Sequence, residues 1–155
     1  MLRAVRSTLG GAGMSASNSR LVLGDACALW ARGDLPGLLS HFVDDVVFSV
    51  HSRPHAASLV GEGLGKVLFA RRLEALLDQV EVLAFDLQSV TTDGIWHRSR
   101  VRYLYRHHAN RMVIDGTMSH RFGFIGDKIA HFELFHDTHR MRAFYDMAGP
   151  VAGGA

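Results

Sequence analysis

The residues 117–122 (TMSHRF) place a single histidine in an alternating run. Successive side chains of a β-strand point to opposite faces, so Met118, His120 and Phe122 share one face. An imidazole titrates near neutral pH and can act as an acid or a base in an apolar pocket. His120 is therefore the best candidate for proton-transfer chemistry. The competing interpretation is a core histidine that hydrogen-bonds Ser99 or a tyrosine.

The preceding strand supplies candidate neighbours for this histidine. If residues 109–110 form a two-residue hairpin turn, Ser99 lies opposite His120 in the sheet. Tyr103 and Tyr105 then lie on the same face, which becomes an apolar and aromatic surface carrying one titratable group.

Three arginines alternate with these residues along the same strand. Arg98, Arg100 and Arg102 share the face opposite to Tyr103, so a pocket on the Tyr103 side leaves them facing outward. We then expect surface ion pairs, with Asp86 as a candidate partner, or a dimer contact. Binding of an anion at a pocket wall is the alternative, and it requires the opposite face assignment.

The ten histidines do not predict a metal site. His51 and His55 are separated by Pro54, so they do not share a helix face, and His136 and His139 straddle a strand end and a helix start. No spacing matches a zinc or iron site. We expect neither a metal nor another cofactor.

Composition limits the partners and the compartment. The 155 residues suit one domain, and 48% hydrophobic and 21% charged residues are ordinary for a globular protein. The formal charge of +2 comes without a basic block, so we expect no nucleic-acid partner. No apolar run approaches the ~18 residues of a membrane span. The single cysteine, Cys27, excludes an internal disulfide and indicates a reducing, cytoplasmic location.

We expect one domain over residues 18–147, between a flexible N-terminal tail (1–17) and a flexible C-terminal tail (148–155). The first segment is basic, contains serine and lacks acids, which is typical of a targeting peptide. The alternatives are a disordered tail, or a start codon placed upstream of a true start at Met14.

Hydrophobic spacing and turn residues predict the elements of this domain. A helix from Asn18 ends at Gly33, and Asp34 caps a short helix that directs Leu38, Leu39 and Phe42 inward. The glycine-rich stretch 53–65 is expected to be a loop. The remaining expected elements are a strand at 46–50, a helix at 66–79, strands at 81–91, 95–107, 112–124 and 129–135, and a last helix from 137 or 138 to 147.

Four stretches of the chain carry a resemblance to a known family: LWARGDLPGLLSHFVDDVV (29–47), GEGLGKVLFA (61–70), HRFGFIGDKI (120–129) and HFELFHDTHRMR (131–142). In this order and spacing they resemble the nuclear transport factor 2-like superfamily, in its SnoaL-like and ketosteroid-isomerase-like branch. The resemblance covers about residues 18–147.

The resemblance implies an α+β fold, in which a cone-shaped, curved, mostly antiparallel sheet wraps around helices and encloses a pocket. It also implies a homodimer formed through the outer sheet face. It does not imply one function, because the superfamily includes isomerases, cyclases, epoxide hydrolases, dehydratases and non-catalytic binding modules.

The catalytic residues of two branches are absent. The tyrosine and the aspartate base of ketosteroid isomerases fall near Ala26 and Val50, and their second aspartate falls on Met118 or His120. Limonene-epoxide-hydrolase relatives need an Asp-Arg-Asp network, and no aspartate lies two residues from the strand arginines. SnoaL-like cyclases use an acid/base on a strand, for which His120 is the best candidate.

Two registers are open for the last strand. The family register turns Phe132, Leu134 and His136 inward and makes His136 a possible catalytic partner of His120. A plain hairpin around residues 126–127 turns Glu133 and Phe135 towards His120 instead. With the family register, the expected pocket wall comprises Trp30, Phe48, Val50, Tyr103, Met118, Phe122 and Leu134.

Three functions remain open at this level. The chain could be an isomerase, cyclase or lyase that acts on a small, mostly apolar carbonyl compound, with His120 as the acid/base and His136 or a tyrosine assisting. It could instead bind such a ligand without catalysis. It could also be a dimerisation module whose interior is filled by side chains.

Overall fold

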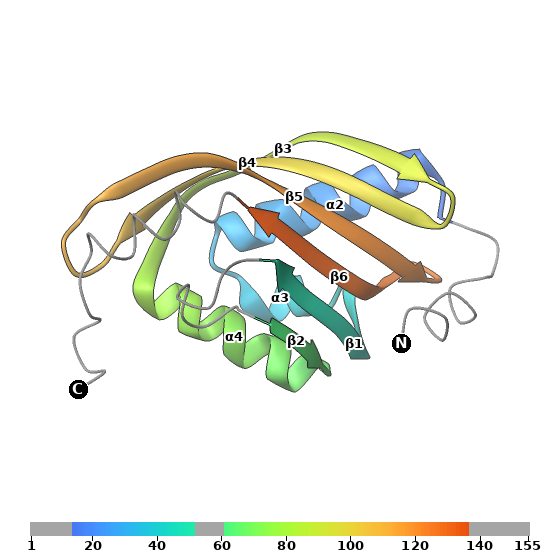
Figure 1. Ribbon diagram of the computed structural model, residues 1–155, viewed down its shortest axis with the longest axis horizontal. Coiled ribbons are helices and arrows are strands. Elements are labelled where there is room, and N and C mark those ends of the chain that lie inside the picture. The colour runs from blue at the N-terminus through green and yellow to red at the C-terminus, as the bar shows by residue number, and fades with distance from the viewer. Residues whose placement is uncertain (1–13, 52–60, 137–155) are drawn as a thin grey trace.

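A computed structural model shows a curved sheet with helices packed on its inner side (Figure 1). The structure describes residues 14–51 and 61–136. The elements in chain order are α2 (Ala16–Ala31), α3 (Leu35–Leu39), β1 (Phe42–His51), β2 (Gly61–Leu64), α4 (Lys66–Gln79), β3 (Val80–Asp93), β4 (Trp96–His107), β5 (Val113–Ile125) and β6 (Lys128–His136). The last expected helix, from 137 or 138 to 147, lies outside the described residues.

The six strands form one sheet in the order β2-β1-β6-β5-β4-β3. The pair β1 and β6 is parallel and the other pairs are antiparallel. The chain returns to the middle of the sheet with β6, and α2 packs against β3 while α4 contacts β1, β2 and β3. This is the expected α+β fold with a mostly antiparallel curved sheet (Figure 1).

The two N-terminal helices follow local capping rules. Helix α2 begins at Ala16, two residues before the expected start and within the segment assigned to the tail, because the Ser15 hydroxyl accepts a hydrogen bond from the Asn18 amide. It ends before Gly33, which has a φ of +70°. The Asp34 carboxylate then caps α3 as expected, accepting from the Gly37 amide at 3.0 Å.

Two strand assignments from sequence are wrong. Strand β1 begins at Phe42, four residues early, so this buried side chain belongs to the sheet and not to the short helix. The expected loop at 53–65 contains β2, which pairs with β1 and sets Gly63 opposite Phe48. Glycines and a proline in the sequence indicate a loop, but here the lack of a side chain at Gly63 lets the Phe48 ring lie over the backbone.

Burial along β4 confirms the assignment of the sheet faces. From Arg98 to Tyr105 the odd-numbered side chains are buried, whereas Arg98, Arg100 and Arg102 are exposed. We call the face that carries Tyr103 the inner face and the face that carries the arginines the outer face. Buried side chains of the inner face pack with those of α2, α3, α4, β1 and β6 into the main hydrophobic core.

A β-bulge decides the register of the last strand. The hairpin between β5 and β6 pairs Ile125 with Lys128, as a plain turn would. Ala130 is then left without an opposite residue, because Phe124 pairs with Ile129 and Gly123 with His131. The extra residue shifts all later pairs by one, so Leu134 and not Glu133 lies opposite His120. The family register is therefore confirmed for the described side chains.

Among the described residues, helices are too short or too polar for any of them to pass through a lipid bilayer.

Candidate functional site

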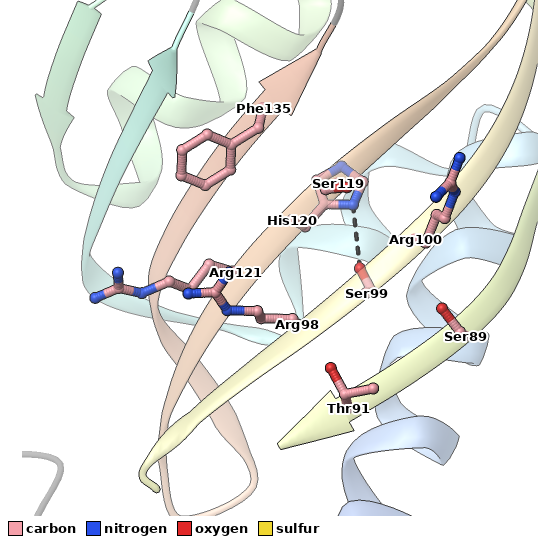
Figure 2. Close-up of a pocket in the computed structure, with 9 residues that line it drawn as sticks. All are labelled: Ser89, Thr91, Arg98, Ser99, Arg100, Ser119, His120, Arg121 and Phe135. Atoms are coloured by element: carbon pink, nitrogen blue, oxygen red, sulfur yellow. Dashed lines mark hydrogen bonds between the residues drawn. The ribbon is translucent and has the colours of Figure 1, made fainter. Parts of the chain in front are cut away.

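His120 lies at the centre of the inner face, with about 6% of its surface exposed. Its Nδ1 atom lies 3.2 Å from the hydroxyl oxygen of Ser99, the residue opposite it on β4 (Figure 2). The predicted pairing of these two residues is thus confirmed. The turn that joins the two strands is longer than expected, because His107 pairs with Met112 across the four residues 108–111.

Aromatic rings surround the imidazole. The Phe132 ring is stacked on it with 5.4 Å between centroids, and the rings of Phe122 and Phe85 follow at 5.7 and 6.1 Å. Phe85 comes from β3 and was not among the expected pocket residues. Its strand pairs with β4 through two irregularities, at 82–84 and 87–89, which alternation alone does not predict.

Two linked sets of side chains extend from His120 to the helices. On one side the Phe132 ring packs against Phe69 of α4, with 5.5 Å between ring centroids, and Phe69 packs against Phe48 of β1, with 5.0 Å between ring centroids. We call His120, Phe132, Phe69 and Phe48 the aromatic row. Each ring therefore depends for its position on the next one along the row.

On the other side, Phe85 stacks parallel to Tyr105 at 6.4 Å between centroids. The Tyr105 hydroxyl accepts a hydrogen bond of 3.1 Å from the indole Nε1 of Trp30 on α2. Tyr103 is fully buried beside Tyr105, at 4.9 Å between centroids. Two phenols thus lie on the inner face, as the strand alternation predicts.

All the side chains expected to line the pocket are buried in the main core: Trp30, Phe48, Val50, Tyr103, Met118, Phe122 and Leu134. The structure brings Phe122 into contact with His120 and pairs Leu134 with it across the strands. The backbone of His136 pairs with Met118, one step further along the sheet. Its side chain lies outside the described residues.

A second buried histidine of the inner face was missed in the sequence. His97 is about 2% exposed, packs edge-on against Phe124, and its Nδ1 has no hydrogen-bond partner within the described chain. Burial lowers the pKa of His97, because the charged imidazolium is poorly solvated there. Its position in the strand alternation with Ser99 is the signal that could have identified it.

The single cysteine does not provide a reactive thiol. Burial, together with the nearby charge of Asp86, raises the pKa of Cys27 to about 12. The thiol is therefore protonated at neutral pH and is a poor nucleophile. Within 14–51 and 61–136, no group of three or more His, Cys, Asp or Glu side chains is arranged to hold a metal ion.

The outer face carries a pocket of its own, with a volume of about 200 Å³ (Figure 2). It is lined by Ser89, Thr91, Arg98, Ser99, Arg100, Ser119, His120, Arg121 and Phe135. Arg98 and Arg100 therefore line a pocket although they lie on the outer face. The expected requirement that these arginines lie on the inner face for such a pocket is wrong.

The ion pairs of the outer face also differ from expectation. Asp86 lies opposite Arg102 in the sheet, but the carboxylate that binds the Arg102 guanidinium is that of Asp115 on β5, at 2.9 and 3.2 Å. Arg121 pairs with Glu133 at 3.1 Å, and its guanidinium carbon lies 4.0 Å from the centre of the Trp96 ring.

Comparison with known proteins places this geometry in a family. The model of the SnoaL-like domain matches residues 24–132, more than half of the chain. No curated protein matches the chain.

Several solved structures share the fold. An NTF2-like protein of unknown function from Burkholderia pseudomallei K96243 is 20% identical, with a TM-score of 0.70 over 83% of this chain and 95% of that one. A candidate isomerase from Bacillus subtilis is 10% identical, with a TM-score of 0.76 over 86% and 96%. A candidate polyketide cyclase from Xanthomonas campestris pv. campestris is 13% identical, with a TM-score of 0.68 over 81% and 98%. The chain thus belongs to the SnoaL-like domain family and shares the fold of NTF2-like proteins.

Proposed function

We propose that the protein binds a small, mostly apolar molecule on the inner face of the sheet and that His120 exchanges a proton with it. The observation that carries this proposal is a buried histidine among aromatic rings, with its Nδ1 within hydrogen-bond distance of the Ser99 hydroxyl. A polar side chain is costly to bury, so its presence at the centre of an apolar face calls for a function or a structural partner.

The geometry around the ring supports a proton-transfer role. The Ser99 hydroxyl engages Nδ1 and so limits the orientations that the imidazole can adopt. The surrounding rings give the imidazole apolar neighbours, which favours an apolar ligand. A proton next to a carbonyl group is the kind of proton that such a base removes in isomerase, cyclase and lyase reactions.

The comparisons support this class of reaction at the level of the family. Structures with this fold carry the designations candidate isomerase and candidate polyketide cyclase. The solved structures described above are at most 20% identical to this chain, so their similarity shows only the fold. The reaction is our proposal.

A non-catalytic module of the same fold is the second candidate. The rings of Phe85, Phe122 and Phe132 all lie within 5.4–6.1 Å of the imidazole centroid, which suits a histidine that serves core packing. In that case Ser99 satisfies a structural side chain, and the ligand, if one binds, is only held in place.

The test is a thermal-shift screen with a panel of small, mostly apolar ketones, aldehydes and esters, followed by turnover assays on every compound that binds. His120→Gln keeps a polar side chain of similar length but cannot exchange protons near neutral pH. His97→Gln is the matched control, because it changes another buried histidine of the inner face.

We expect turnover that is lost in His120→Gln and kept in His97→Gln. A compound that is converted equally well by His120→Gln would show that His120 is not the acid/base. Compounds that bind without turnover in the unmodified protein would favour the non-catalytic module.

A further inference from the structure

The outer-face pocket lies between two rows of side chains that cross the sheet. In one row Ser89, Arg100 and Ser119 are neighbours on β3, β4 and β5, and Phe135 of β6 follows them. We call the pocket between this row and the next one the arginine groove (Figure 2).

The second row is displaced from the first by two residues on each strand, towards the turn between β3 and β4. Thr91 of β3, Arg98 of β4 and Arg121 of β5 are direct neighbours, and Glu133 of β6 ends the row. The two rows place three guanidinium groups and three hydroxyl groups around one pocket. All of these groups are hydrogen-bond donors.

The positive charge of the groove is incompletely neutralised. Glu133 pairs with Arg121, but Arg98 and Arg100 make no ion pair with a carboxylate in the described part of the chain. Both side chains are exposed. By contrast Arg102, the next arginine on the same face, is bound at two atoms by Asp115.

One wall of the groove is rigid. The Arg121 guanidinium is held between the Glu133 carboxylate and the Trp96 ring, which is about 6% exposed. A donor that is already fixed in place loses little conformational freedom when a ligand binds. The groove therefore has one fixed cation beside two cations that can adjust.

The size of the pocket limits the ligand. A volume of about 200 Å³ is below the ~300 to 1,000 Å³ that is typical of sites for drug-sized molecules. Guanidinium groups match the paired oxygens of a carboxylate or phosphate, and hydroxyl groups complete such a shell. We propose that the arginine groove binds a small oxyanion, namely a phosphate or carboxylate group. The arginines reach the groove from the outer face, and Ser99 and His120 of the inner face also border it.

The competing occupant is a second copy of the chain, because the family resemblance implies dimers through the outer sheet face. A symmetric contact over this face would bring the unneutralised arginines of two copies together, which opposes association unless acids of the partner reach them. The structure favours the oxyanion because the donors surround one pocket and the acids Asp115 and Glu133 are already paired.

The experiment measures the melting temperature during titration with sodium phosphate and, in a second arm, sodium acetate, with NaCl keeping the ionic strength constant. The variants are Arg98→Gln with Arg100→Gln, and the matched control Arg102→Gln on the same exposed face. All three side chains are exposed, so the variants are expected to fold. The NMR signals of Arg98, Arg100, Ser119 and Arg121, which lie on the outer face, report whether binding occurs in the groove.

We expect a saturable rise in melting temperature of at least about 2 °C in the unmodified protein and in Arg102→Gln, and loss of that rise in the double variant. Saturation by phosphate or by acetate identifies the class of oxyanion. A rise that persists in the double variant, or no saturable rise with either anion, would overturn the proposal. A dimer whose outer face takes up neither anion would show instead that a second copy covers the groove.

Discussion

The contact between Gly63 and Phe48 offers a sharp test of the aromatic row. A Cβ atom at Gly63 would lie 2.1 Å from Cζ of Phe48 and 2.6 Å from its Cε1. Carbon atoms prefer separations of about 3.5–4.0 Å, so in Gly63→Ala the Phe48 ring must move by more than about 1 Å. Phe48 is about 3% exposed and packs against Phe69, which leaves the ring no free space on that side.

The expected cost follows from this displacement. Overpacking of a well-packed core destabilises a protein by about 1–3 kcal/mol. For a chain of 155 residues, each kcal/mol corresponds to about 3 °C in melting temperature. We therefore expect Gly63→Ala to lower the melting temperature by roughly 3–9 °C, with a matching loss in urea unfolding.

A second substitution tests the cause. Phe48→Leu shortens the side chain and removes the atoms nearest to Gly63, so the cost of Gly63→Ala should be smaller by about 1 kcal/mol or more in that background. Gly24→Ala is the control. Gly24 lies in α2, and among the described residues a Cβ atom there would meet only Cδ2 of Leu87 on β3, at an ordinary contact distance of 3.9 Å. There the better helix former should stabilise the protein by about 0.5–1 kcal/mol.

Equal stability of Gly63→Ala and the unmodified protein would refute the placement of the Phe48 ring. A cost that stays the same in the Phe48→Leu background would show that the damage arises elsewhere.

Two further predictions concern pH and the inner hydrogen bond. Burial lowers the pKa of His97, and burial together with the charge of His108 lowers the pKa of His107. Below about pH 6.5 the unfolded chain therefore binds more protons than the folded one, and the stability decreases as the pH is lowered, by at most about 1.4 kcal/mol per pH unit for each histidine. Urea midpoints at pH 7.5 and 5.5 should differ less in a variant with glutamine at both positions, and an unchanged difference would contradict this. Trp30→Phe removes the donor to the Tyr105 hydroxyl, and a double-mutant cycle with Tyr105→Phe should give a coupling of about 0.5–1.5 kcal/mol, with zero coupling arguing against the bond.

Local patterns in the sequence determined much of the inner face. Strict alternation along residues 98–105 and 117–122 set which side chains point inward, because a strand permits only two directions. The pairing of Ser99 with His120 followed from the position of the turn alone, and it survived a longer turn because the loop stayed symmetric about the same centre. Gly33, through its positive φ, and Asp34, through its capping carboxylate, marked a helix boundary.

The tertiary structure decided what depends on partners distant in sequence. The bulge at Ala130 shifts one strand by a residue and so sets Leu134, not Glu133, opposite His120. Strand β2 exists because β1 offers it hydrogen bonds and Phe48 fills the space over Gly63, a fact that glycine content hides.

The neighbours of the candidate site residues likewise could not be predicted from the sequence. Phe85 reaches His120 only because β3 carries two irregularities, and the arginine groove needs β3, β4, β5 and β6 to align their outer side chains in rows. Alternation along one strand gives the direction of a side chain. Its neighbours depend on the register between strands, which the packing of the whole sheet determines.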